Sequence, residues 1–288
     1  MARTSSVTPS HCGRHWSIHA RQWSHIGPPL RPSAEDVTVV MTGVRDWIQA
    51  NDRSVSTLLI LGVTPELCTL PTQAIDRIIA VDSSAEMISA IWPGRIRLQD
   101  SAIRADWQQI PLAAGSIDLA AADGSFALLQ FPGGYARVLA ELQRLLRRDG
   151  RCIVRCFAQA ETPESVSDVF DALRRGLIGS FHVLKWRLAM ALQEGAATGV
   201  VLARVWEALH AEWPSLEALA GQFQWPIADV RTIDAYRNVG RTYCFPTLVE
   251  HCEAFSESGF SVVSIVTPSY ELGNRCPTVV LERSSPPA

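Results

Sequence analysis

The chain has 288 residues, of which 47% are hydrophobic and 19% charged, as is typical of a globular protein with a substantial core. Its formal net charge of −3 gives no sign of a nucleic-acid backbone or an anionic membrane as partner. No apolar run approaches the ~20 residues of a membrane span, so we expect a cytoplasmic protein without membrane or nucleic-acid partners. The seven cysteines are odd in number and lie mostly inside apolar patterns, which favours a reducing compartment.

Residues 1–50 are expected to form an N-terminal arm and a lid helix. The first 34 residues carry four arginines and no acid, which faintly resembles an organelle transit peptide. Apolar side chains such as Trp16 and Trp23 favour a structured arm instead. Apolar residues then repeat at helical spacing from Val37 to Ile48, and Ser33 is placed to cap this helix.

Strand-like and helix-like patterns alternate through residues 51–160. Apolar runs at 57–62, 77–82, 95–100, 116–123 and 151–157 are expected to be strands. "SSAE" (83–86) predicts a capping box with Ser83 as the cap, and the stripe from 135 to 146 predicts a helix. This order predicts βαβ units and a doubly wound, mostly parallel sheet.

The alternation stops at residue 161. Residues 161–242 are expected to be a helical cap, with one helix near 166–177, another near 201–209 and a third beginning at Ser215. A helix over 245–260 and strands over 261–268 and 277–283 then complete the main domain, which spans 51–160 and 243–288. The two last strands are joined by too few residues for a parallel crossover, so they should form an antiparallel hairpin.

This order of elements resembles the class I S-adenosylmethionine (SAM)-dependent methyltransferases. In that superfamily the seventh strand inserts antiparallel between the fifth and the sixth. The resemblance covers about residues 55–160 and 243–283, and it implies an α/β fold with seven strands and SAM as the cofactor.

The motifs imply a cofactor site. "LLILGVTPE" stands where the superfamily usually has an acid followed by Gly-x-Gly-x-Gly, and of the glycines only Gly62 is kept. "AVDSSAEM" matches the stretch whose acid, here Asp82, binds the ribose hydroxyls. "ADWQQIPLAAGSIDLAAADGSF" resembles the stretches at the adenine and methionine ends, and Trp or Arg side chains of the arm could close over the cofactor. The implied cofactor residues are Gly62, Thr64, Pro65, Asp82, Ser83, Met87, Asp106, Trp107, Asp123, Gly124, Ser125, Trp23 and Arg31.

The loop at Gly62 lacks phosphate-binding glycines, but SAM carries no phosphate, and Thr64 with Pro65 still forms a good helix start. A base is needed only where the acceptor must lose a proton, and His182, Tyr243 and His19 are the candidates. Trp16, Tyr236, Arg241 and Trp186 are candidates for acceptor binding. The histidines of the arm match no zinc spacing, and no acidic metal cluster stands out, so no metal is expected.

The sequence therefore predicts a metal-independent SAM-dependent methyltransferase that acts on a small molecule with an oxygen, nitrogen or carbon nucleophile. One alternative is a SAM-binding or S-adenosylhomocysteine-binding regulatory or partner subunit without catalysis. A nicotinamide-dependent reductase is a third reading, disfavoured because Gly-x-Gly-x-x-Gly is absent. The number of copies that assemble is left open, with a homodimer as one candidate.

Overall fold

A computed structural model describes residues 11–71 and 73–284 of the chain, so the first ten residues of the expected arm lie outside it. Within these ranges a seven-stranded sheet has the order β3-β2-β1-β4-β5-β9-β8. The strands are β1 (Leu58–Leu61), β2 (Ile78–Asp82), β3 (Ser101–Arg104), β4 (Ile117–Asp123), β5 (Leu146–Arg155), β8 (Phe260–Val266) and β9 (Thr278–Arg283). β9 lies between β5 and β8 and is antiparallel to both, and the other pairs are parallel. The predicted fold class is confirmed.

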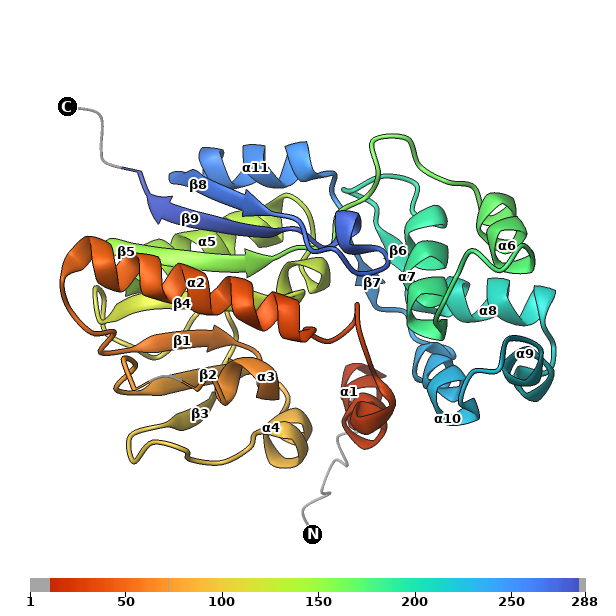
Figure 1. Cartoon of the computed structure of the whole chain (residues 1–288), viewed down its shortest axis with the longest axis horizontal. Coiled ribbons are helices and arrows are strands. Elements are labelled where there is room, and N and C mark those ends of the chain that lie inside the picture. The colour runs from red at the N-terminus through yellow and green to blue at the C-terminus, as the bar shows by residue number, and fades with distance from the viewer. Residues whose placement is uncertain (1–10, 72, 285–288) are drawn as a thin grey trace, which may run out of the picture.

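Helices cover both faces of this sheet (Figure 1). α2 (Ala34–Asn51), α3 (Pro65–Cys68) and α4 (Ala85–Ile91) pack on one face, and α5 (Gly133–Leu145) and α11 (Leu248–Glu257) on the other. Ser33 caps α2, as the sequence predicted, and Asp36 completes a capping box with it. Burial of both faces explains why β1 and β4 are apolar along almost their whole length.

Local predictions at three places were wrong. The third strand is 101–104 instead of 95–100, and Ile96 and Leu98 of the expected strand are exposed. Asp100 is buried there because its carboxylate accepts hydrogen bonds from the amides of Ile78 and Arg97, which fixes a turn. Ser84 caps α4 in place of Ser83, and β5 begins at Leu146, five residues ahead of the predicted start at 151 (151 − 146).

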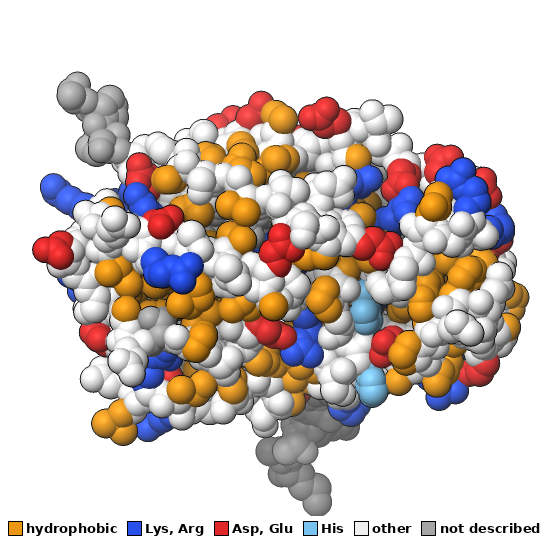
Figure 2. All heavy atoms as spheres, viewed as in Figure 1, with side chains coloured by type: hydrophobic (Ala, Val, Ile, Leu, Met, Phe, Trp, Pro, Cys, Tyr) orange, Lys and Arg blue, Asp and Glu red, His pale blue; other side chains and the backbone are white. Residues whose placement is uncertain are grey.

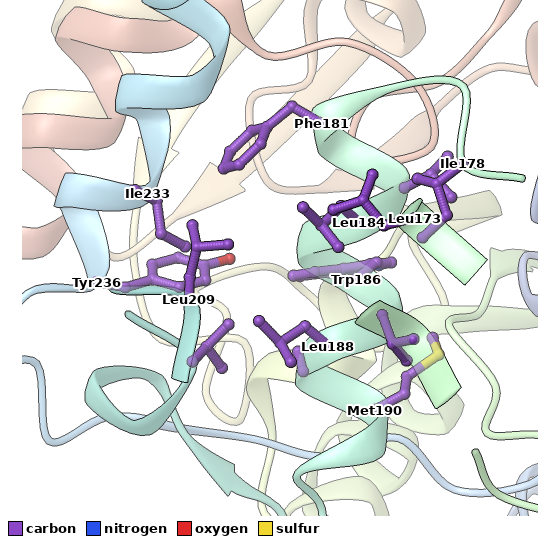
Figure 3. Packing of buried hydrophobic residues seen from close by; sticks show 14 of the residues in the cluster. Leu173, Ile178, Phe181, Leu184, Trp186, Leu188, Met190, Leu209, Ile233 and Tyr236 are labelled. Carbon is purple, nitrogen blue, oxygen red and sulfur yellow. The ribbon is translucent and has the colours of Figure 1, made fainter. Parts of the chain in front are cut away.

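The cap contains α6 (Val166–Arg174), α7 (Phe181–Ala191), α8 (Leu202–Glu212), α9 (Leu216–Phe223), α10 (Ile227–Val230) and η3 (Arg231–Tyr236). β6 (Val200–Val201) and β7 (Thr242–Tyr243) pair antiparallel where the chain enters and leaves it. Ser215 caps α9, as predicted. α7 runs through the middle of an apolar core that includes Leu184, Leu209 and Ile233 (Figure 3).

The arm forms α1 (His11–Gln22) and η1 (Trp23–His25), and α1 lies between α4 and the cap (Figure 1). The remaining short turns are η2 (Ser125–Leu128) and η4 (Gly273–Arg275). Acidic and basic side chains are interspersed over the face that Figure 2 shows. None of the helices in the described residues has the length and apolar character that a bilayer crossing requires.

Candidate functional site

A cavity of about 780 Å³, its open mouth included, lies where the carboxyl ends of the parallel strands meet the arm and the cap. Ligands of open α/β sheets collect at this edge. The sheet contributes Leu61, Gly62, Val63, Thr64, Asp82, Met87, Trp107, Asp123, Gly124 and Ser125. The opposite wall is formed by Trp16, His19, Trp23, Ile26, Leu30, Ala127, Leu128, Phe157, Trp186, Tyr236 and Tyr243.

The loop after β1 keeps one glycine because its backbone requires it. Gly62 has a φ of +107°, which only glycine adopts easily, and its amide donates to the carbonyl of Val81 at 2.7 Å. Thr64 occupies the N-cap position of α3 and Pro65 its first turn, as predicted, but the Thr64 side chain makes no capping hydrogen bond. The loop therefore presents backbone and small side chains to the cavity.

Asp82 ends β2 and faces the same cavity. Its Oδ1 accepts a hydrogen bond of 2.8 Å from the amide of Ser84, and none of the ion pairs among the described residues includes it. Burial raises the pKa of this carboxyl, and the Ser84 amide and the charge of Arg241 oppose that rise. A carboxylate without a charged partner is suited to accept hydrogen bonds from ligand hydroxyls. Trp107 stands nearby, held by its indole N–H to the carbonyl of Val81 at 2.6 Å.

Asp123 ends β4 and belongs to a buried ionic network. The guanidinium of Arg155 binds its carboxylate, donates to the carbonyl of Pro29 at 2.9 Å, and lies 3.8 Å from Asp36. The Tyr270 hydroxyl donates to Asp36 at 3.0 Å. Burial raises the pKa of Asp123, and the nearby Arg155 opposes that rise. The network thus joins the end of β4 to the arm and to α2.

A second polar group lies between the arm and the cap. Nδ1 of His15 lies 2.9 Å from the carbonyl of Ala235, which can only accept, so Nδ1 carries the proton. Nε2 of His15 is then a lone-pair acceptor for the Tyr243 hydroxyl at 3.3 Å. Burial lowers the pKa of His15 to about 4, so the ring stays neutral at pH 7. The Tyr243 proton is therefore directed away from the cavity, toward His15.

His19 lines the cavity with a buried Nε2 that has no hydrogen-bond partner. Its pKa is lowered well below the ordinary value by burial, and then by the charges of His15 and Lys185. Trp23 and Trp186 line the same cavity, and their indole nitrogens are also buried without partners. Buried polar atoms without partners are rare in proteins, and three of those in the described residues belong to side chains that line this cavity.

Of the predicted site residues, Gly62, Thr64, Asp82, Met87, Trp107, Asp123, Gly124, Ser125, Trp23, Tyr243, His19, Trp16, Tyr236 and Trp186 line this cavity. Arg31 does not, because its guanidinium binds the carboxylate of Glu66. Asp106 is exposed and accepts from the amide of Gln108 in a local turn. Ser83 is exposed as well, one residue before the helix cap.

Three further predicted residues lie beside the cavity without lining it. Pro65 continues into α3 behind the loop. His182 is buried in α7, and a side chain at Gly27 would meet its ring at 3.4 Å. The guanidinium of Arg241 lies 5.4 Å from the ring centroid of Trp16, and it is Trp16 that lines the cavity.

Sequence reasoning missed Phe157, Arg155 and His15. A signal existed for the first two, since both come at the end of the fifth strand, and a charge inside a buried strand needs a partner. His15 carried no such signal, because its partners Ala235 and Tyr243 are more than 200 positions away.

The described residues contain no group of three or more His, Cys, Asp or Glu side chains that could hold a metal ion.

Residues 61–154 match a family profile described as a methyltransferase domain. This match begins at the last residue of β1 and ends in β5, the region whose strand ends form the sheet wall of the cavity. This match and the strand order of the sheet support the class I SAM-dependent methyltransferase superfamily. SAM is the cofactor of this superfamily, as the sequence predicted.

Solved structures share the fold of this chain at low sequence identity. The 1,6-didemethyltoxoflavin-N1-methyltransferase from Burkholderia thailandensis, bound to 1,6-didemethyltoxoflavin and S-adenosylhomocysteine, is 12% identical with a TM-score of 0.52, over 99% of this chain and 94% of that one. A Rhodobacter sphaeroides protein described as a putative zinc-dependent alcohol dehydrogenase is 13% identical with a TM-score of 0.59, over 97% and 100% of the chains.

A complex of the Haloferax volcanii Trm112 methyltransferase activator with a putative methyltransferase gives 13% identity and a TM-score of 0.50, over 97% of this chain and 100% of that one. At such identities these likenesses establish the fold and nothing finer. No curated protein matches the sequence significantly.

Proposed function

We propose that the chain transfers the methyl group of SAM to a small-molecule acceptor with an oxygen, nitrogen or carbon nucleophile, without a metal. The observation that carries this proposal is the position of Asp82. Its carboxylate ends β2, forms no ion pair among the described residues, and faces the cavity that Gly62 and Asp123 also line. This is the placement that ribose recognition requires in an open α/β sheet.

The residues present fit SAM along the sheet wall. A side chain at Gly62 would meet only the Thr64 hydroxyl, at 3.9 Å, so the backbone there is open to a ligand. Asp82 would hold the ribose hydroxyls and Trp107 would lie beside the adenine. Asp123, Gly124 and Ser125 would line the methionine end, with Ser125 fixed by its hydrogen bond to the Leu61 carbonyl at 2.8 Å. SAM supplies an electrophilic methyl group on a positively charged sulfur.

The chain's own part in the reaction is alignment, exclusion of water and removal of a proton where the acceptor has one. Neutral His19, which lines the cavity and has a buried Nε2 without a hydrogen-bond partner, is our candidate for the base. Tyr243 is a positioning residue, because its own proton is engaged by His15. The proposal does not require His182, Arg31 or Asp106, which do not line the cavity.

Calorimetric titration with SAM and S-adenosylhomocysteine tests the cofactor site. We expect micromolar binding, and Asp82→Ala should weaken it roughly tenfold or more, as expected when hydrogen bonds to a charged group are lost. Asp106→Ala is the matched control, because it removes an exposed acid of the same region and should leave binding unchanged. Equal loss in both variants, or no binding by folded protein, would contradict the proposal.

The non-catalytic reading is favoured by one observation, the loop in which Thr64 and Glu66 stand where the superfamily usually has glycine. Tight SAM binding without methyl transfer to any acceptor would support a regulatory or partner subunit. A SAM-dependent product from a small-molecule library, detected by mass spectrometry, would support catalysis.

A further inference from the structure

The wall of the cavity opposite the sheet is built mainly of aromatic rings. Trp186 extends from α7 toward Tyr236 (Figure 3), and both line the cavity. The Trp186 ring lies 5.8 Å from that of Tyr243 and 5.0 Å from that of Phe157, in each case nearly perpendicular. Perpendicular rings present both faces and edges, which suits a flat aromatic ligand.

The charges around this wall disfavour both anions and cations. The only acids lining the cavity, Asp82 and Asp123, are on the sheet side, and no Lys or Arg is among the described residues that line it. Two cations instead lie over rings of the aromatic wall. Lys185, the only lysine in the sequence, lies 5.2 Å from the ring centroid of Tyr236, and Arg241 lies over Trp16.

An anionic acceptor would find no Lys or Arg among the described lining residues to pair with directly, because Lys185 and Arg241 lie behind the rings of Tyr236 and Trp16. A cationic acceptor would compete with Lys185 and Arg241 for the π-systems of Tyr236 and Trp16, against like-charge repulsion. An uncharged acceptor avoids both costs.

The hydrogen-bonding groups of this wall have fixed roles. The indole N–H of Trp186 is buried without a partner, and it can only donate. The Tyr243 hydroxyl donates its hydrogen bond to Nε2 of His15, which leaves the lone pairs of its oxygen as acceptors. A complementary ligand therefore offers one acceptor atom to Trp186 and one N–H or O–H to Tyr243, from a single flat ring system.

We propose that the methyl acceptor is an uncharged, planar aromatic molecule that carries an N–H or O–H donor beside a hydrogen-bond acceptor. Trp186 binds the acceptor atom and Tyr243 receives the donor, which is the group to be methylated. This inference rests on the proposed function, since it treats the aromatic wall as the acceptor subsite.

Calorimetry of the full chain saturated with S-adenosylhomocysteine tests this pattern with defined probes. Carbostyril, a flat lactam with N–H and C=O side by side, and β-naphthol, with an O–H, are the expected ligands. β-Naphthoate has a similar shape with a negative charge and should bind at least about a hundredfold more weakly, as expected for an unpaired buried carboxylate. Perhydrocarbostyril, which is not planar, should also bind far more weakly.

Two variants separate hydrogen bonding from packing. Trp186→Phe keeps an aromatic face but removes the N–H donor. It should therefore weaken the binding of carbostyril about three- to tenfold more than the binding of naphthalene. Trp206→Phe is the matched control, because the Trp206 indole bonds to Asp234 outside the cavity, and neither ligand should be affected. Tyr243→Phe should weaken the binding of carbostyril but leave the binding of N-methylcarbostyril, which lacks the N–H donor, unchanged.

The outcomes distinguish this inference from the proposed function. Binding of S-adenosylhomocysteine together with preference for β-naphthoate or perhydrocarbostyril, or with no binding of any probe, overturns the acceptor class alone. The same holds if Trp186→Phe weakens carbostyril and naphthalene equally. Binding of the flat neutral probes without any binding of the cofactor supports the acceptor class and overturns methyl transfer. Preference for carbostyril over β-naphthol indicates a nitrogen acceptor, and the reverse an oxygen acceptor.

Discussion

Gly124 shows how one residue shapes the cavity at the end of β4. Its φ of +60° places it in the left-handed region, and an added Cβ would overlap the ring of Phe157. Both residues line the cavity, so the glycine allows Phe157 to close against the end of β4. Without that approach the aromatic wall and the sheet wall could not meet.

Replacement of Gly124 by alanine should therefore reduce both stability and cofactor binding. Gly115→Ala is a matched control, because Gly115 has a φ of +63° but nothing within 4 Å of an added Cβ. Strain alone should lower the free energy of unfolding by about 1 kcal/mol in Gly115→Ala. The overlap should add about 1–3 kcal/mol in Gly124→Ala, measured by urea unfolding. Equal losses would show that Phe157 moves aside freely.

Site residues could be predicted from sequence where their position depends on local chain order. Asp82 and Asp123 each end an apolar run, so the strand-end rule places them at the sheet edge. Arg31 could not be placed in this way, because the decision between a ligand and Glu66 depends on a contact 35 residues away. His182 was equally out of reach, since α7 is buried on several sides and its sequence does not say which side faces a cavity.

The arm is the element on which the cavity depends most, because it contacts both other parts of the fold. On the cap side, His15 bonds to the Ala235 carbonyl and Gln22 donates to the Arg231 carbonyl at 3.1 Å. On the sheet side, Arg31 binds Glu66 while its guanidinium lies 4.9 Å from the ring centroid of Trp23. Trp16, His19 and Trp23 line the cavity from this arm, so a ligand has to pass it or move it.

Loss of the contact between the arm and the loop after β1 should speed ligand release. In Arg31→Gln we expect S-adenosylhomocysteine to dissociate about three- to tenfold faster, as expected when a hydrogen-bonded, partly buried ion pair is lost. Arg45→Gln is the control, because Arg45 is an exposed residue of α2 that bonds only to Thr42 among the contacts described. Stopped-flow displacement gives both rates. An unchanged rate in Arg31→Gln would mean that the arm is not held by this pair.

At the level of elements, the sequence predicted the sheet better than the helices of the cap. β1 is buried on both faces and is a continuous apolar run, and β4 is apolar except for Asp118 and the Asp123 that ends it. α7 was not predicted as a helix, because residues 181–186 are all buried and leave no 3.6-residue periodicity. The third strand was misplaced for the opposite reason, since an edge strand with half-buried side chains carries a weak pattern.

Over the whole molecule, burial of titratable groups should make stability depend on pH in two separate windows. Burial lowers the pKa of His15 and of His251 to about 4, and that of His182 to about 3, from an ordinary value of 6.5. The unfolded chain therefore binds more protons below pH 6.5, and the free energy of unfolding should fall as the pH decreases from 6.5 toward 4. Above pH 6.5 these histidines are neutral in both states and contribute no slope.

Lys185 produces the alkaline window. Burial lowers its pKa from 10.5 to about 7, a shift that the charge of Asp229 opposes. The unfolded chain binds the extra proton between these values, so the stabilisation is full above pH 10.5 and is lost as the pH falls to about 7.

Lys185→Met keeps the approximate length of the side chain and removes its charge. The Thr232 hydroxyl then loses the hydrogen bond from Lys185 but keeps the one that it donates to the Asp229 carbonyl at 2.6 Å. We expect the free energy of unfolding of the variant at pH 7 to be about 1–4 kcal/mol higher, as when buried charges are replaced by apolar side chains. The gain in stability of the variant over the original chain should shrink as the pH rises from 7 to 10, because only the original chain contains the titrating lysine. Both proteins should keep the fall below pH 6.5, because the buried histidines remain. Urea titrations at closely spaced pH values measure both slopes.

Since Lys185 is the only lysine, its pKa can also be followed directly by NMR in selectively labelled protein. A lysine that titrates near 10.5 together with an unchanged alkaline slope in the variant would show that water reaches the amine and that the cap is less closed than its packing indicates.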